Sequence, residues 1–302
     1  MVNALVCGTS SHGFDSHYSP HWILIKILSY KILISFSSQK SFFNEKKRLY
    51  VVATPIGNLN EFSQRSIDTL KNSELLICEN KINCLKLLKH FKIAKKKIII
   101  YNNISEKSEY LTSKTLELML NYDNISIISC AGYPLVSDPG RLIIKEWIRR
   151  GFYVIPISGS SAFLNALVCS GFYCHNFAFL GFLPKSKVKQ SKILSIYHNN
   201  FNFALVIYES PHRIFKTLSN INEFMGNRMI AVCKEITKIH EEFIRGSVKD
   251  VISHFHNSKE IIKGEYVIVV SIDLPEDQPF INRVLSVKKS KLVKNAVNKI
   301  KN

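Results

Sequence analysis

The chain has 302 residues, of which 46% are hydrophobic and 21% charged. This is the ordinary composition of a soluble globular protein, and the length suggests about two domains. The formal net charge of +18 favours a polyanionic partner such as RNA, DNA or an anionic membrane, although a general bias toward Lys, Ile and Asn would produce it as well. The seven cysteines have irregular spacings and no CxxC pair, which argues against a zinc site and favours a reduced, cytoplasmic setting.

Residues 1–48 differ from the rest and are expected to form an N-terminal extension. The apolar run HWILIKILSYKILISF (21–36) is interrupted by Lys26 and Lys31, so it falls short of a membrane-spanning helix. A targeting segment, an interfacial helix and an extension without function all remain open. We favour the last of these, and we predict no membrane partner.

The next part of the chain, residues 49–158, is predicted to be an α/β domain with a mostly parallel sheet. Short β-rich runs alternate with segments of helical periodicity, which is the pattern of parallel α/β proteins. The expected strands are 49–54, 74–80, 97–101, 125–129 and 153–157, and the expected helices are 63–71, 82–91, 105–121 and 141–150.

A second α/β domain is predicted over residues 159–275. Several of its strands are close neighbours in sequence, which favours a mixed or antiparallel sheet. Residues 276–302 read as a basic amphipathic tail helix, either solvated or in contact with RNA. The expected strands are 177–182, 203–210, 229–236, 241–248 and 265–272, and the expected helices are 187–198, 213–224 and 248–256.

Three turns follow strands of the first domain, where ligands bind in open α/β sheets. They are ATPIGN (53–58), SCAGYPLVSDPG (129–140) and SGSSA (158–162). None carries the glycine pattern of a dinucleotide-binding turn or a P-loop, which argues against an NAD enzyme and a P-loop NTPase. Each could be an ordinary tight turn, but three together indicate a site.

Polar residues also gather in the second domain, at YESPHR (208–213). Glu209, His212 and Arg213 suit a polar ligand, whereas a helix cap at Ser210 with a surface pair between Glu209 and Arg213 is the structural alternative.

Two further charged segments could also belong to a functional site. KEITKIHEEF (234–243) carries Glu235 within a charge cluster. GFLPKSKVKQSK (181–192) offers four lysines that could neutralise RNA phosphates. Both segments could equally be solvated loops.

In this order, LYVVATPIGNL, SDPG, GFLP, YESPHR, KEITKIHEEFIRG and KGEYVIVV resemble the bacterial 16S ribosomal RNA ribose 2′-O-methyltransferases of the tetrapyrrole methylase superfamily, also called class III S-adenosylmethionine methyltransferases. The resemblance covers roughly residues 49–275. It implies two α/β domains with a cofactor cleft between them and a homodimer. It further implies S-adenosylmethionine-dependent methylation of the ribose of cytidine 1402 in 16S RNA of the small ribosomal subunit.

The resemblance also assigns roles to residues, because the matching motifs carry the family's site. The general base would be Glu209, His212 or Glu235, and no metal is implied. RNA contacts would come from Lys185, Lys187, Lys189, Lys192 and Arg213. The cofactor would contact Pro55, Gly57, Asn58, Ala131, Gly132, Pro134, Ser137, Asp138, Gly140, Gly159, Ser161 and Ala162, with Pro139, Ser210 and Arg213 close by.

Three motifs of the first domain depart from the family pattern. ENKI (79–82) stands where the family has EDTR, SCAGYP (129–134) where it has SDAGTP, and SGSSA (158–162) where it has PGPSA. Two alternatives therefore stay open. One is an RNA-binding or subunit-binding protein without activity on the same fold. The other is a methylase acting on a small tetrapyrrole.

Overall fold

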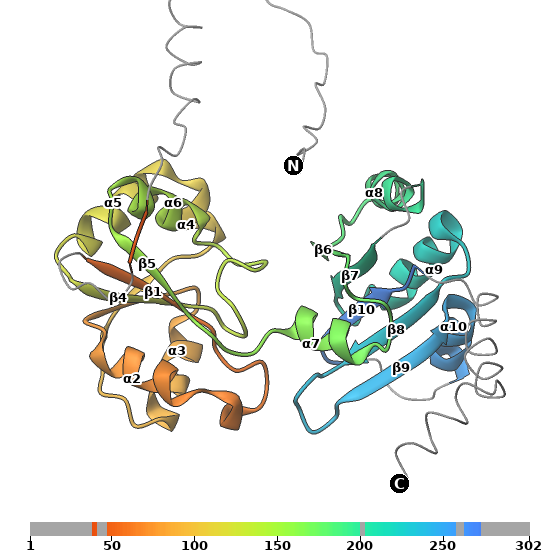
Figure 1. Ribbon diagram of the computed structural model, residues 1–302, viewed down its shortest axis with the longest axis horizontal. Coiled ribbons are helices and arrows are strands. Elements are labelled where there is room, and N and C mark those ends of the chain that lie inside the picture. Colours follow the sequence, from red (N-terminus) through yellow and green to blue (C-terminus); the bar gives the residue numbers. More distant parts are fainter. Residues whose placement is uncertain (1–37, 41–46, 200–202, 258–262, 273–302) are drawn as a thin grey trace, which may run out of the picture.

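The computed structural model describes residues 38–40, 47–199, 203–257 and 263–272. Two α/β domains lie beside each other and are joined by the segment that leads from β5 into α7 (Figure 1). The predicted extension 1–48 lies almost wholly outside the described residues, and the predicted tail helix 276–302 lies entirely outside them. No described helix has the length and apolar character needed to cross a membrane.

The N-terminal domain contains a five-stranded sheet in the order β3-β2-β4-β1-β5. All of its strand pairs are parallel, which confirms the predicted sheet. Because β1 lies between β4 and β5, the turn that follows it lies at the carboxyl edge between the loops that follow those two strands. The strands are β1 (Arg48–Val52), β2 (Leu75–Cys78), β3 (Lys97–Ile100), β4 (Asn124–Ile128) and β5 (Tyr153–Ile157).

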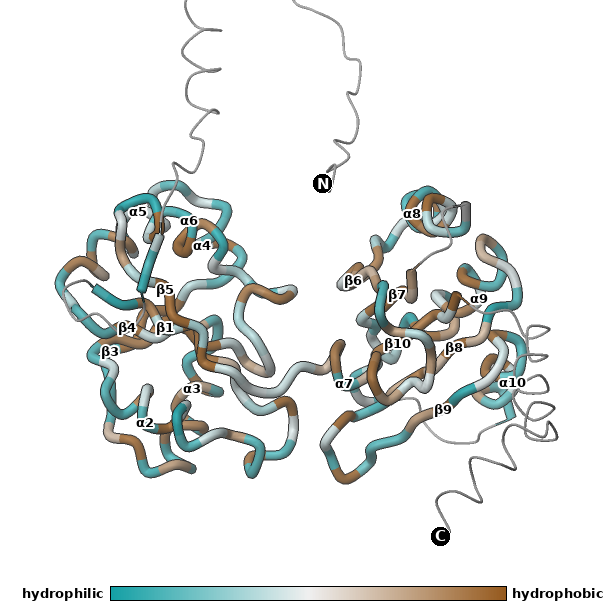
Figure 2. Tube along the Cα trace, viewed as in Figure 1, coloured by the Kyte–Doolittle hydropathy of each residue, from teal (hydrophilic) through white to brown (hydrophobic). Residues whose placement is uncertain are grey.

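Helices cover both faces of this sheet because each central strand is apolar on both sides. On one face Leu70 and Leu88 pack against the strands, and on the other Met119 and Trp147 do. Figure 2 shows hydrophobic residues along these strands. The helices are η1 (Leu59–Glu61), α2 (Gln64–Asn72), α3 (Lys81–His90), α4 (Asn103–Lys107), α5 (Glu109–Met119) and α6 (Arg141–Arg149).

The single helix expected over 105–121 is in fact two helices, α4 and α5. Asn102 caps the first by accepting from the Ile104 and Ser105 backbone N–H groups. Ser108 then starts the second by accepting from the Leu111 N–H at 3.3 Å. Asn and Ser side chains favour an extended cap conformation over a continuing helix, and that preference breaks the helix at Ser108.

The C-terminal domain contains a second five-stranded sheet, in the order β6-β7-β10-β8-β9. β6 and β7 are parallel and the remaining pairs are antiparallel, so the predicted mixed sheet is confirmed. Its strands are β6 (Phe177–Phe182), β7 (Ala204–Glu209), β8 (Met229–Lys234), β9 (Glu242–Ser247) and β10 (Tyr266–Val270).

Helices of this domain cover the two faces unequally. The helices α8 (Lys187–Asn199), α9 (Ile214–Met225) and α10 (Val248–Asn257) pack on one face through Leu194, Leu218 and Val251. The helix α7 (Ala162–Cys169) packs on the other face. That face looks toward the N-terminal domain (Figure 1).

Contacts between the two domains involve the turn after β1. The Asn58 backbone N–H donates to Thr237 Oγ1 at 3.3 Å. Gly57 lies so close to Lys238 that an added Cβ would be 2.3 Å from its Cγ atom. Ile56 joins the apolar cluster formed by α7 and the second sheet. The predicted cofactor residues Gly57 and Asn58 therefore lie at the domain junction.

Candidate active site

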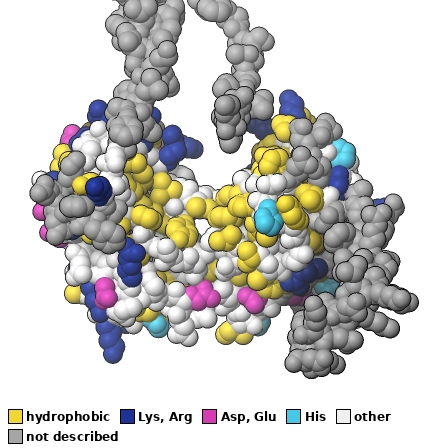
Figure 3. All heavy atoms as spheres, viewed as in Figure 1, with side chains coloured by type: hydrophobic (Ala, Val, Ile, Leu, Met, Phe, Trp, Pro, Cys, Tyr) yellow, Lys and Arg dark blue, Asp and Glu magenta, His cyan; other side chains and the backbone are white. Residues whose placement is uncertain are grey.

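An interdomain cleft of about 340 Å³ lies between the carboxyl edge of the first sheet and the second domain. Figure 3 shows hydrophobic side chains on both sides of the hollow between the domains. The lining residues that carry charge are acidic, since no Lys, Arg or His is among them in the described chain. The lining consists of Ile56, Cys130, Ala131, Gly132, Tyr133, Val136, Ser137, Asp138, Ser161, Ala162, Phe182, Tyr208, Glu209, Ser210, Pro211, Ile236, Gly264, Glu265, Tyr266 and Val267.

The loop after β4 is held against the turn after β1 by a two-residue antiparallel bridge. The Thr54 N–H donates to Gly132 O at 2.8 Å, and the Gly132 N–H donates to Thr54 O at 3.0 Å. Ser129 Oγ donates to the same Gly132 carbonyl at 2.8 Å. Gly132 has a φ of +78°, a conformation that a side chain disfavours. This bridge fixes one wall of the cleft.

Farther along the same loop, the backbone adopts conformations that are costly for residues other than glycine. Leu135 and Ser137 have φ values of 70° and 68°. The surrounding structure must therefore hold them in place. Glu106 does so at the end of the loop, where it accepts from the Gly140 N–H at 2.9 Å and the Leu142 N–H at 3.0 Å. Because these N–H groups belong to the N-cap residue and the first turn of α6, Glu106 caps that helix.

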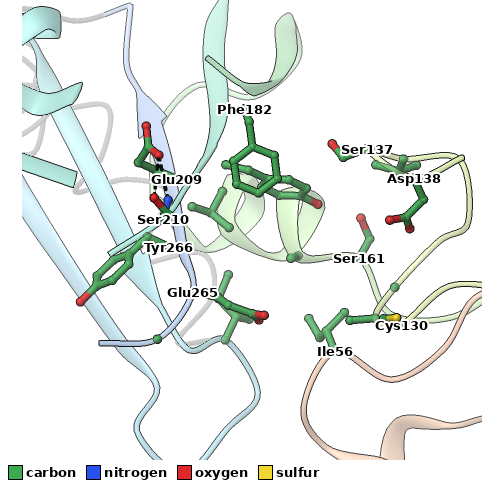
Figure 4. Close-up of a pocket in the computed structure, with 18 of the residues that line it drawn as sticks. Ile56, Cys130, Ser137, Asp138, Ser161, Phe182, Glu209, Ser210, Glu265 and Tyr266 are labelled. Carbon is green, nitrogen blue, oxygen red and sulfur yellow. Dashed lines mark hydrogen bonds between the residues drawn. The ribbon is translucent and has the colours of Figure 1, made fainter. Parts of the chain in front are cut away.

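Asp138 projects into the cleft opposite the second domain (Figure 4). Burial raises the pKa of this carboxyl to about 6, and the negative charge of Glu79 adds to the effect. A carboxylate in such a place gains from a positively charged ligand.

Tyr133, one of the residues that depart from the family pattern, bridges two walls of the cleft. Its phenol oxygen accepts from the Gly159 N–H at 3.3 Å. Gly159 itself is packed tightly, since a Cβ there would be 3.0 Å from that of Ala53. The predicted cofactor residue Gly159 therefore has its N–H directed to a side chain of the protein.

Glu209 comes from the end of β7 and is buried, with a relative exposure of 2%. It accepts from Thr217 Oγ1 at 2.6 Å and from the Ser210 N–H at 2.8 Å, and it pairs with Arg213 at 3.2 Å. Arg213 also donates to Leu183 O at 2.7 Å. These bonds fix the turn after β7, so Glu209 lines the cleft as an acceptor that is already engaged.

The helix after this turn begins within one residue of its expected start at residue 213. α9 starts at Ile214, with Arg213 as its N-cap and no side-chain capping bond. The pair between Glu209 and Arg213 is not a surface pair, because the carboxylate is buried. The alternative of a Ser210 cap with a surface pair is therefore wrong.

Glu235 lies outside the cleft lining, beside its rim. Its carboxylate accepts from Lys238 Nζ at 2.7 Å and from the Glu265 N–H at 2.8 Å. Burial alone would raise the pKa of Glu235, but these hydrogen bonds outweigh it and lower the pKa below its usual value. Lys238 also reaches Glu265, at 2.9 Å. Glu235 thus helps to position Glu265, which does line the cleft.

The structure brings some of the predicted site residues together and separates others. Seven line the cleft: Ala131, Gly132, Ser137, Asp138, Ser161, Ala162 and Glu209. The others, which do not line it, are Pro55, Gly57, Asn58, Pro134, Gly140, Gly159, His212, Glu235 and the RNA-contact candidates Lys185, Lys187, Lys189, Lys192 and Arg213.

His212 and the four lysines are exposed. The lysines surround the start of α8, and Lys187 pairs with Glu223 at 2.7 Å.

Sequence reasoning missed a group of cleft residues in the second domain. Tyr208 and Phe182 pack edge to face with ring centroids 5.6 Å apart. Residues 264–267 enter from the start of β10, and Ile236 from the turn after β8. The motifs YESPHR and KGEYVIVV contain several of these residues, so their aromatic and apolar members were the available signal.

Comparison with known proteins identifies the family to which this fold belongs. The family model for tetrapyrrole (corrin/porphyrin) methylases matches residues 48–252. The chain belongs to the tetrapyrrole methylase family. Within that family it is similar to proteins named ribosomal RNA small subunit methyltransferase I. That of Bacillus subtilis is 38% identical over 74% of this chain and 74% of its own length. That of Thermotoga maritima is 36% identical over 74% of this chain and 98% of its own length.

Solved structures show the same fold for this methylase. The methyltransferase CobJ aligns with a TM-score of 0.54 at 15% identity, covering 74% of this chain and 94% of its own. A diphthine synthase aligns with a TM-score of 0.56 at 12% identity, covering 74% and 89%. Its family thus identifies the chain as a methyltransferase. The distant solved structures show only that the fold is shared.

The cleft of this methylase fits S-adenosylmethionine in charge and character. The cofactor carries a sulfonium and an ammonium with one carboxylate, and the cleft offers Asp138 and Glu265 among apolar side chains. The absence of basic residues among the described lining argues against a phosphate-bearing ligand. Ile56, Phe182 and Tyr208 supply apolar surface for an aromatic base.

Proposed function

We propose that the protein transfers a methyl group from S-adenosylmethionine to the ribose 2′-hydroxyl of cytidine 1402 in 16S ribosomal RNA. The observation that carries the proposal is a cleft with acidic residues as its only charged lining in the described part of a chain of charge +18. Such a cleft favours a cationic cofactor, while the basic exterior favours a polyanionic substrate. The names of the relatives supply the substrate class.

The side chains of this site would act mainly by orientation and exclusion of water. The bound cofactor supplies a methyl group on a sulfonium, which is a good leaving group without further activation. Asp138 and Glu265 would neutralise its positive charges. Phe182 and Tyr208 would keep water away from the reacting atoms. Positioning of this kind can supply much of a rate enhancement.

Of the three candidate bases, none is placed ideally for the proton of the 2′-hydroxyl. Glu209 is engaged by three donors, and Glu235 by Lys238. His212 is exposed at the turn after β7 and does not line the cleft. We therefore assign Glu209 a positioning role and propose that the proton leaves through the solvent side of the cleft.

A labelling assay tests the proposal. Purified protein is incubated with methyl-labelled S-adenosylmethionine and small ribosomal subunits that lack the modification, and the RNA is mapped by mass spectrometry. We expect one new ribose methyl group at the decoding-site cytidine. An unchanged cytidine, with active control enzyme in the same assay, would overturn the proposal. Light scattering of the same preparation tests the homodimer, which remains a prediction.

One observation favours a second candidate, a protein that binds RNA or the ribosomal subunit without methylating it. Tyr133 places a phenol in the cleft and engages the Gly159 N–H, a group expected to approach the cofactor. The decisive comparison is between the wild type and the Cys130→Asp, Tyr133→Thr double variant. A wild type without activity and an active double variant would favour this candidate over the first.

A further inference from the structure

A second depression, the α3 groove, lies on the other side of the bridge between Thr54 and Gly132. It encloses about 500 Å³ between α3 and the ends of β1 and β4. Leu59, Leu87 and Ile128 are among its apolar lining residues. Thr54 lines the groove and Gly132 lines the cleft, so the bridge is the wall between the two spaces.

The charge of the groove is opposite to that of the cleft. The basic residues of its described lining are Lys86 and His90, and no acidic residue is among that lining. Asn83, Lys86 and His90 follow at helical spacing, so they share one side of α3. All three are exposed. An amide, an ammonium and an imidazole above an apolar floor are the groups that bind a nucleotide's base edge, phosphate and ring.

The groove and the cleft meet at one residue, since Cys130 lines both. Consecutive residues of the turn after β1 line the two spaces, since Pro55 lines the groove and Ile56 lines the cleft. A ligand in each space would therefore approach the other beside Cys130.

The topology of the sheet also favours a ligand at this place. β1 and β4 are neighbours, and the connections that follow them run in opposite directions along the sheet, toward β2 and toward β5. The helices of these connections, α2 and α6, lie on opposite faces (Figure 1). Two such neighbours leave a crevice at their carboxyl ends, where open α/β sheets bind ligands.

We propose that the α3 groove binds the acceptor nucleotide of the RNA substrate. The pyrimidine base lies on the apolar floor with Asn83 at its edge, and Lys86 faces a neighbouring phosphate. The ribose then lies beside Cys130, where the groove opens to the cleft. This inference rests on the proposed function and specifies where its substrate binds.

Three single variants test the groove: Asn83→Ala, Lys86→Ala and His90→Ala. Lys89→Ala is the matched control, because Lys89 is exposed on the same helix but does not line the groove. The KM for small-subunit RNA and the Kd for S-adenosylmethionine are measured for each. We expect the groove variants to raise the KM by about fivefold to fiftyfold and to leave the cofactor Kd within about twofold. The control should match the wild type.

Two results would overturn the subsite. One is a raised cofactor Kd in the groove variants, which would place the cofactor there. The other is a KM equal to that of the control in all three.

The binding of a fluorescent decoding-site oligonucleotide, measured by anisotropy, separates this proposal from the proposed reaction. Groove variants that lose affinity for the oligonucleotide would support the subsite even if the wild type transfers no methyl group. Equal affinities in all variants would count against the subsite whether or not methyl transfer occurs.

Discussion

Asp138 lies in the cleft and has a raised pKa. Its negative charge therefore lowers the stability of the empty protein but favours the binding of a cation. Its pKa of about 6 lies above the ordinary 3.8, so the folded state binds this proton more tightly than the unfolded state. The contribution of Asp138 to stability is therefore fully present below about pH 4 and is lost as the pH rises through about 6. The residue is unfavourable for the empty protein at neutral pH but favourable for binding a cation.

The Asp138→Asn variant tests this opposition. At pH 8 we expect a free energy of unfolding about 1–2 kcal/mol higher than that of the wild type, and the difference should vanish as the pH falls toward 4. The Kd for S-adenosylmethionine should rise about tenfold. Urea unfolding at several pH values and calorimetric titration measure the two effects. Asp68→Asn, on the exposed side of α2, should change neither.

Glu209 gives a second test at the scale of a residue. Glu209→Gln keeps the shape of the side chain but removes the negative charge that faces Arg213, and we expect a loss of about 1–3 kcal/mol in stability. If Glu209 only positions the turn after β7, kcat falls while the shape of its pH profile is kept. A profile that loses its acidic limb would identify Glu209 as the base instead.

The residues of the cleft were predictable to different degrees for a physical reason. The loop after β4 could be recognised from its glycines, its prolines and Asp138, because tight turns require particular residue types. Glu265 and Tyr208 could not be recognised in the same way. Tyr208 lies within β7 and Glu265 directly before β10, and the packing of the two domains brings them to the cleft.

At the scale of elements, the alternation of strands and helices was sufficient to predict both sheets. The parallel and mixed pairings followed from the lengths of the connections. The predictions failed where one side chain decides the local geometry. Ser108 divides one expected helix into α4 and α5. Periodicity reports the buried face of a helix but not where a cap interrupts it.

The cap of α6 by Glu106 supports the loop that carries Asp138. Glu106→Ala removes an acceptor shared by the Gly140 and Leu142 N–H groups, so we expect the protein to lose about 1–2 kcal/mol of stability. Thermal unfolding measures the loss. Glu117→Ala, at an exposed position of α5, serves as the control and should remain within about 0.5 kcal/mol of the wild type. Equal stability of the two variants would contradict the role of Glu106.

At the scale of the whole molecule, charge is divided between the exterior and the cleft. Lys189 and Lys192 are exposed near the start of α8, on the second domain. If they contact RNA phosphates, replacing both with Ala should reduce the magnitude of the slope of log K for RNA binding against log salt concentration by about one to two. Filter binding between low and moderate salt measures this slope. Lys249→Ala, on α10, should leave it unchanged, and an unchanged slope in the double variant would exclude these lysines from the RNA interface.

The two sheets have separate apolar cores, and Ile56 from the turn after β1 joins the cluster of the second domain. It also lines the cleft. Because the two cores are separate, each domain should melt as its own cooperative unit in the absence of ligand, giving two overlapping heat-absorption peaks. A molecule bound between the domains would couple them, and the peaks should merge into one at higher temperature. Scanning calorimetry would then report occupancy of the cleft for any compound, whether or not a methyl group is ever transferred.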